Sequence, residues 1–171
     1  LRDPKDGIRF MPRLNRAMSA TRVQPELAIK DLTSVIEEDP SILMARRTRA
    51  VAYAAAGRHD LAIADIRELE KISELTPDDE IMLGDNLRFT GQYPEAARVL
   101  ERAVQGSPKA AQPLISLAEV RISEKQYDVA AATLERALKL APDQIEALRR
   151  LGDLALLRTD MDAAGARYAR I

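Results

Sequence analysis

The stretch GQYPEAARVLERAV, residues 91–104, decides the fold. It recurs as GRHDLAIADIRELE from residue 57 and as KQYDVAAATLERAL from residue 125, so the three starts lie 34 residues apart. Each copy carries an alanine at the same place, with bulkier apolar residues following at helical spacing. The size of the side chains at a helix contact sets how closely two helices approach. The repetition therefore predicts a stack of similar helix pairs.

The same frame extends over residues 9–171 without an insertion. It predicts repeats at 9–42, 43–76, 77–110, 111–144 and 145–171, the last one truncated, with residues 1–8 as a lead-in. The small site of the second helix is occupied by Ala28, Ala62, Ala96, Ala130 and Ala164, and that of the first helix by Ala50, Gly84, Ala118 and Gly152. Glycine inside a helix costs about 1 kcal/mol relative to alanine. Its presence at this site therefore predicts close contact between helices.

The composition favours helices throughout. Alanine, leucine, arginine and glutamate dominate, and the sequence has no alternation of β-branched residues that would predict strands. Short turns such as TPDD at residue 76 and TGQYP at residue 90 separate the helical segments, which must then pack antiparallel to their neighbours. Thr76, Pro77 and Asp79 have the pattern of an N-cap, a first-turn proline and a capping acid.

These residues closely resemble the tetratricopeptide repeat, a 34-residue pair of antiparallel helices. The resemblance covers residues 9–171 and rests on the in-frame alanines, on segments such as LAEVR and KQYDVAAATLERALKLAP, and on prolines that end repeats, at Pro40, Pro108 and Pro142. It implies an all-α solenoid of about ten helices in a right-handed superhelix. The second repeat departs from the pattern, with Glu74 in place of the proline and Arg46 and Arg49 at apolar positions, and the first repeat departs at Val23 and Pro25.

Several functional classes find no support in the residues. The net charge of −1 gives no basic surface for nucleic acid, and no apolar run is long enough to cross a membrane. The chain has no cysteine, and its single histidine, His59, stands where later repeats carry Tyr93 and Tyr127. No phosphate loop or nucleophile motif is present. We therefore expect no catalytic residues, metal or cofactor in these repeats.

Function must then lie on a surface, and the resemblance implies a concave face lined by the first helix of each repeat. The frame places Arg13, Arg47, Ile81, Ile115 and Arg149 at one position of that face and Ala17, Val51, Asp85, Glu119 and Asp153 one turn later. We predict a groove for a protein or peptide partner, lined by Arg13, Arg47, Asp85, Glu119, Arg149 and Asp153. The alternative is a solvated face whose local ion pairs contribute little.

The two ends of the chain carry separate expectations. Pro12 should interrupt a helix, so we expect an extended lead-in and a first helix that starts near Phe10. DPKDGI, residues 3–8, resembles the junction between catalytic domain and repeats in some bacterial sulfatases. At the other end, Leu156 and Leu157 lie on a last helix pair without a cap. Either the natural chain continues there, or the apolar end pairs with another copy.

Three functions remain open from the sequence. The first is a scaffold that binds a protein or peptide, and the second is an accessory domain of a larger bacterial hydrolase, such as a sulfatase. The third, an RNA-binding helical repeat, conflicts with the 34-residue period and the acidic groove positions. The sequence does not distinguish a cytoplasmic from a periplasmic location.

Overall fold

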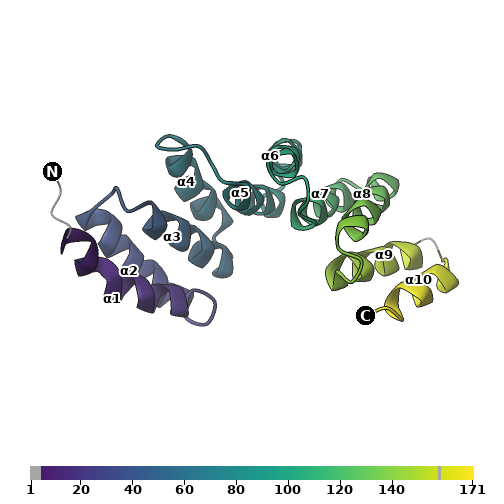
Figure 1. The fold of residues 1–171 in the computed structure, drawn as a ribbon, viewed down its shortest axis with the longest axis horizontal. Helices are drawn as coiled ribbons and strands as arrows, with labels where there is room; N and C mark the ends of the chain where they lie inside the picture. The colour runs from purple at the N-terminus through teal and green to yellow at the C-terminus, as the bar shows by residue number, and fades with distance from the viewer. Residues whose placement is uncertain (1–4, 158) are drawn as a thin grey trace. The chain divides into compact units, whose positions relative to one another are not determined.

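The structure is a computed structural model that describes residues 5–157 and 159–171, and these residues form ten α-helices and no strand (Figure 1). The helices are α1 (Lys5–Ala20), α2 (Pro25–Glu38), α3 (Leu43–Ala55), α4 (His59–Glu70), α5 (Pro77–Phe89), α6 (Tyr93–Gly106), α7 (Gln112–Ser123), α8 (Tyr127–Leu140), α9 (Ile145–Leu157) and α10 (Met161–Tyr168). Short turns join them into consecutive pairs. The predicted all-α fold is confirmed.

The chain divides into two compact units, which we call the N-terminal unit (Leu1–Leu75) and the C-terminal unit (Thr76–Ile171). In the N-terminal unit α1 packs on α2, α2 on α3 and α3 on α4, around a core that includes Phe10, Leu14, Leu32 and Val35. In the C-terminal unit each helix from α5 to α10 packs on the next, and α5 also packs on α7. Each unit therefore builds its own core from neighbouring helices.

The predicted alanine column lies at these helix contacts. Ala28, Ala62, Ala96 and Ala130 are fully buried, and Ala164 is 2% exposed. The residue four places later is buried in the first four cases and exposed in the last, where Tyr168 follows Ala164. The alanines thus set the approach of the two helices in each pair, as the repetition predicts.

The turn inside each of four helix pairs has the same backbone geometry. Residues in the left-handed region recur every 34 positions, at Gly57, Gly91, Lys125 and Thr159. The residue after each one donates its backbone N–H to the carbonyl five positions earlier, as Gln92 does to Leu87 at 2.9 Å and Gln126 to Arg121 at 2.8 Å. This is the hydrogen bond of a Schellman motif, which satisfies a free carbonyl at the end of a helix.

The start of α5 has the predicted capping box. The Thr76 hydroxyl accepts the backbone N–H of Asp79 at 3.2 Å, and the Asp79 carboxylate accepts the backbone N–H of Thr76 at 3.0 Å. Pro77 occupies the first helical position, where its missing N–H removes no helical hydrogen bond. The first residue of the C-terminal unit therefore also fixes where its first helix begins.

The expectation for the start of α1 is wrong. The helix begins at Lys5 instead of near Phe10, and Pro12 lies inside it. Proline in a helix removes one hydrogen bond and costs about 3 kcal/mol. Burial of Phe10, Leu14 and Ala17 against the neighbouring helices offsets that cost. Residues 1–4, which include part of the expected lead-in, lie outside the described residues.

Gly84 shows whether the glycines on the first helices of the repeats are explained by the close approach of a neighbouring helix. A methyl group on its Cα would stand 2.4 Å from Cγ of Leu100 on α6. Alanine gains about 1 kcal/mol in helix propensity, but overpacking costs about 1–3 kcal/mol and is the larger effect here. We expect Gly84→Ala to lower the free energy of unfolding by up to about 2 kcal/mol, measured by urea denaturation.

Gly165 on α10 provides the matched control. A methyl group there would meet no atom within 4 Å. The same substitution, Gly165→Ala, should therefore raise the free energy of unfolding by about 1 kcal/mol through helix propensity alone. Equal effects at the two glycines would contradict the close-approach argument.

Candidate partner-binding surface

The first helices of the C-terminal unit bring carboxylates together. Asp85 lies on α5, Glu119 on α7 and Glu146 on α9, and the negative charges of Glu146 and Glu119 act on Asp85. Asp85 and Glu119 were predicted groove residues, whereas Glu146 was not. Its place in the first turn of α9 is one where acids are common for helix stability alone, so the sequence did not single it out.

Asp85 is the most perturbed of these carboxylates. Its side chain is half-buried, and the Ser116 hydroxyl on α7 donates to it at 3.3 Å. The pKa of Asp85 is raised to about 6, mainly by burial and also by the charges of Glu146 and Glu119, against the lowering effects of the Ser116 hydrogen bond and of Arg88. A carboxylate with such a pKa is held in its charged form at neutral pH at a cost to stability.

Glu119 and Asp153 are both engaged within the unit. Glu119 is 9% exposed and forms an ion pair with Arg150 on α9. Asp153 accepts the Tyr168 hydroxyl at 2.7 Å, and Arg150 lies 3.8 Å from it. The hydrogen bond to Asp153 raises the pKa of Tyr168. Among the predicted acids, Asp85 is therefore left with the least compensation from the chain.

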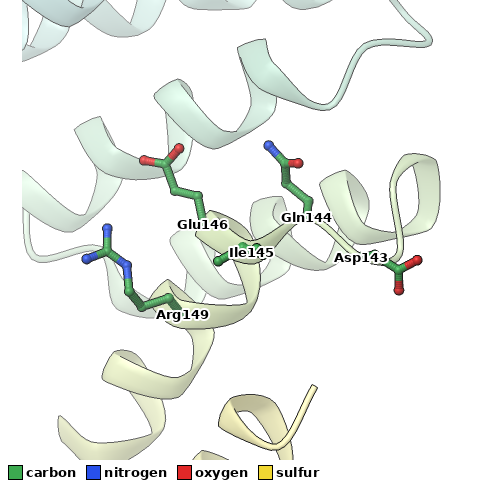
Figure 2. Close-up of a pocket in the computed structure, with 5 residues that line it drawn as sticks. All are labelled: Asp143, Gln144, Ile145, Glu146 and Arg149. Atoms are coloured by element: carbon green, nitrogen blue, oxygen red, sulfur yellow. The ribbon is translucent and has the colours of Figure 1, made fainter. Parts of the chain in front are cut away.

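An open hollow of about 580 Å³ lies at the start of α9. It is lined by Asp143, Gln144, Ile145, Glu146 and Arg149 (Figure 2). Figure 2 shows the side chains of Gln144 and Glu146 pointing to the same side of the chain, while Asp143 points away from them. Arg149 is exposed, as a groove residue should be. A polar acceptor, a carboxylate and a guanidinium thus face one solvent-accessible depression.

The basic residues of the predicted groove lie in the N-terminal unit. Arg13 on α1 donates to the Ser34 hydroxyl at 2.8 Å and pairs with Glu38, both on α2. Arg47 is half-buried on α3. Because Arg13 and Arg47 belong to one unit and the acids to the other, a continuous groove across both remains a prediction.

One expectation for this face needs correction. Ile115 is 1% exposed and belongs to the core of the C-terminal unit, so it does not line a surface. The frame identifies equivalent positions, but the packing of α7 between its neighbours buries this one. In the segment RRTR, residues 46–49, Arg49 makes two hydrogen bonds of 2.7 Å to Asp65 on α4, and Arg46 lies 3.7 Å from the same carboxylate. Two arginines of RRTR therefore serve helix packing.

Other kinds of site find no support in the described part of the chain. Its residues hold no group of three or more histidine, cysteine, aspartate or glutamate side chains arranged to bind a metal ion. None of the helices in the described ranges is both long and apolar enough to span a bilayer. His59 lies half-buried at the start of α4, as Tyr93 and Tyr127 start α6 and α8.

Comparison with protein families identifies the repeats. One tetratricopeptide repeat model matches residues 23–80 and a second matches residues 90–151. This chain is built of tetratricopeptide repeats. The match over residues 23–80 lies mostly in the N-terminal unit, and the match over residues 90–151 lies in the C-terminal unit. The helix pairs, the buried alanines and the recurring turns described above are the structural features of these repeats.

Solved structures show the same fold at low sequence identity. MamA from Desulfovibrio magneticus RS-1 is 20% identical, with a TM-score of 0.79, over 94% of this chain and 92% of that one. TTC0263, a thermophilic tetratricopeptide repeat protein of Thermus thermophilus, is 21% identical, with a TM-score of 0.78, over 94% and 89%. YrrB, described as having an unusual peptide-binding site, is 19% identical, with a TM-score of 0.68, over 93% and 82%. At these identities the likeness is one of fold.

The search of curated proteins found no match. The comparisons bring no support to the resemblance of residues 3–8 to a sulfatase junction, and residues 3 and 4 lie outside the described ranges. Leu156 and Leu157 are 43% and 65% exposed at the end of α9. Self-association through that end remains a prediction.

Proposed function

We propose that this chain is an interaction module that binds a protein or peptide through the face of α5, α7 and α9. Stacked helical repeats present extended surfaces rather than enclosed catalytic sites, which favours binding over catalysis. The proposal rests on two carboxylates that have no ion-pair partner in the part of the chain that the structure describes. Among the described residues, neither Asp85 nor Glu146 forms an ion pair, although the negative charge of Glu146 acts on Asp85.

This arrangement favours a cationic partner. Two neighbouring carboxylates that form no ion pair repel each other, and a lysine or arginine side chain placed between them would remove that repulsion. The open hollow beside Glu146 leaves room for such a side chain, and Gln144 adds a hydrogen-bonding group there. The proposed ligand is therefore a peptide segment that contains lysine or arginine.

Fluorescence anisotropy with three labelled peptides of equal length tests this. One is rich in lysine, one is rich in glutamate and one is neutral, and all are measured at about pH 7.5, where the carboxylates are charged, and at moderate salt. We expect the lysine-rich peptide to bind most tightly. Glu146→Lys should weaken its binding by about tenfold, equivalent to about 1.4 kcal/mol, because the reversed charge repels the ligand.

Asp162→Lys is the control, since Asp162 lies in the first turn of α10 as Glu146 lies in the first turn of α9, although Asp162 is exposed and Glu146 is half-buried. It changes the net charge equally and tests whether the effect is local to the proposed face. Equal affinity for all three peptides, or an equal loss in both variants, would count against the proposal.

A further inference from the structure

Asp85 occupies an unusual place in the packing of the C-terminal unit. Its side chain lies on α5, which packs on both α6 and α7. Its one hydrogen bond among the described residues comes from Ser116 on α7, and at 3.3 Å this is long for a bond between oxygen atoms. Carboxylates that stay charged in folded proteins usually accept several short hydrogen bonds or pair with a cation. Asp85 does neither.

The charged groups around Asp85 do not compensate for this. On α5, Arg88 is the one cation that favours the charged form, and its guanidinium lies 4.2 Å from the ring centroid of Phe89. On α7, Glu119 is paired with Arg150, and on α9 Glu146 adds a second negative charge.

The charges of α6 are engaged with other groups. Arg102 pairs with Glu80 on α5, and Glu101 pairs with Arg121 on α7. Neither Arg102 nor Glu101 is among the groups that shift the pKa of Asp85. The fold thus holds one half-buried carboxylate near two others with little to stabilise its charge.

We propose that Asp85 makes the C-terminal unit proton-sensitive, so that proton uptake by its carboxyl group strengthens the packing of α5 against α7. A protonated carboxyl can also donate a hydrogen bond, which the carboxylate cannot. This proton sensitivity is a property of the chain without any ligand.

The direction of the effect follows from linkage. The pKa of Asp85 is about 6 in the folded chain, against an ordinary value of 3.8. The folded state therefore binds this proton more tightly than the unfolded state does. The contribution of Asp85 to stability is full below pH 3.8 and is lost as the pH rises through about 6, the reverse of a carboxylate in a salt bridge.

A second consequence rests on the proposed function. A cationic ligand favours the charged form of the Asp85 carboxylate, whereas protonation removes that charge. The ligand and the proton therefore compete. Binding of the lysine-rich peptide should then weaken as the pH falls from about 7.5 to about 5.5 in the natural chain. The Asp85→Asn variant lacks the titrating group and should lose much less affinity over the same range.

Urea denaturation of the whole chain from about pH 5 to about pH 8 tests this proton sensitivity, with Asp85→Asn as the variant. We expect the unfolding equilibrium constant of the natural chain, relative to the variant, to fall by about tenfold from about pH 8 to about pH 5. Asp162→Asn removes an exposed carboxylate of the same unit and should show no such trend. A constant ratio between the natural chain and Asp85→Asn would overturn the proposal.

A direct titration covers the case in which the variant does not fold. The carboxyl carbon of Asp85 in the natural chain, followed by NMR, should titrate with a midpoint near 6. A midpoint near the ordinary value of about 4 would overturn the proposal. If the lysine-rich peptide binds at no pH while the midpoint is near 6, the proposed function fails and the proton sensitivity stands.

Discussion

Arg49→Leu is expected to lower the free energy of unfolding by about 3 kcal/mol, because it removes the main partner of a buried carboxylate. Asp65 is 4% exposed, and Arg49 donates to both of its oxygens at 2.7 Å. That pairing also raises the pKa of Arg49. After the substitution Arg46 remains 3.7 Å from Asp65 as a more distant partner, so the compensation is partial. Urea denaturation of the single variant measures the loss.

A double variant distinguishes the cost of burying an unpaired charge from the cost of losing packing contacts. The repeat places Leu83 and Val99 at the positions of Arg49 and Asp65, and both are buried in the C-terminal unit. Arg49→Leu with Asp65→Val therefore introduces an apolar pair already used by this chain. Buried ion pairs replaced by apolar residues often lose little stability.

We expect the double variant to lie within about 1 kcal/mol of the natural chain, while Asp65→Val alone loses nearly as much as Arg49→Leu. The coupling energy of this cycle is the quantity to compare. A double variant as unstable as the sum of the two single variants would show that the arginine contributes through packing instead of charge.

The sequence predicted the helix pairs because their cause is local and repeated. A small residue every 34 positions in a helical stack allows two helices to approach closely, and Ala28, Ala62, Ala96 and Ala130 are all fully buried. The start of α1 was missed because it is decided by distant contacts. The cost of Pro12 is visible in the sequence, whereas the burial of Phe10 and Ala17 that offsets it is not.

The candidate surface was only partly predictable for a related reason. The frame gives equivalent positions along successive helices, so it found Asp85 and Glu119. It does not give the partners that a side chain meets, so it could not show that Arg150 pairs with Glu119. Nor could it show that Ile115 is buried, or that Glu146 acts on Asp85. These relations depend on how each helix is rotated against the next.

Ala130→Leu should destabilise the C-terminal unit by about 2–3 kcal/mol, because it adds bulk where none fits. Ala130 is fully buried in the cluster formed by α7, α8 and α9, with Leu114, Ala118 and Leu134 as other members. A larger side chain must push α8 away from α7 or adopt a strained rotamer. Thermal unfolding followed by circular dichroism should show a lower midpoint.

The adjacent residue supplies the control that distinguishes a specific contact from a general intolerance of leucine on α8. Ala131 is half-buried and lines a cavity of about 160 Å³ together with Leu151 and Leu154. Leucine at this position has space to enter and buries apolar surface, so Ala131→Leu should leave stability unchanged or raise it by about 1 kcal/mol. If both variants lost stability equally, the helix as a whole would resist bulk. If neither did, the alanine column would not set the approach of the helices, and the physical reason for its 34-residue recurrence would have to be sought elsewhere.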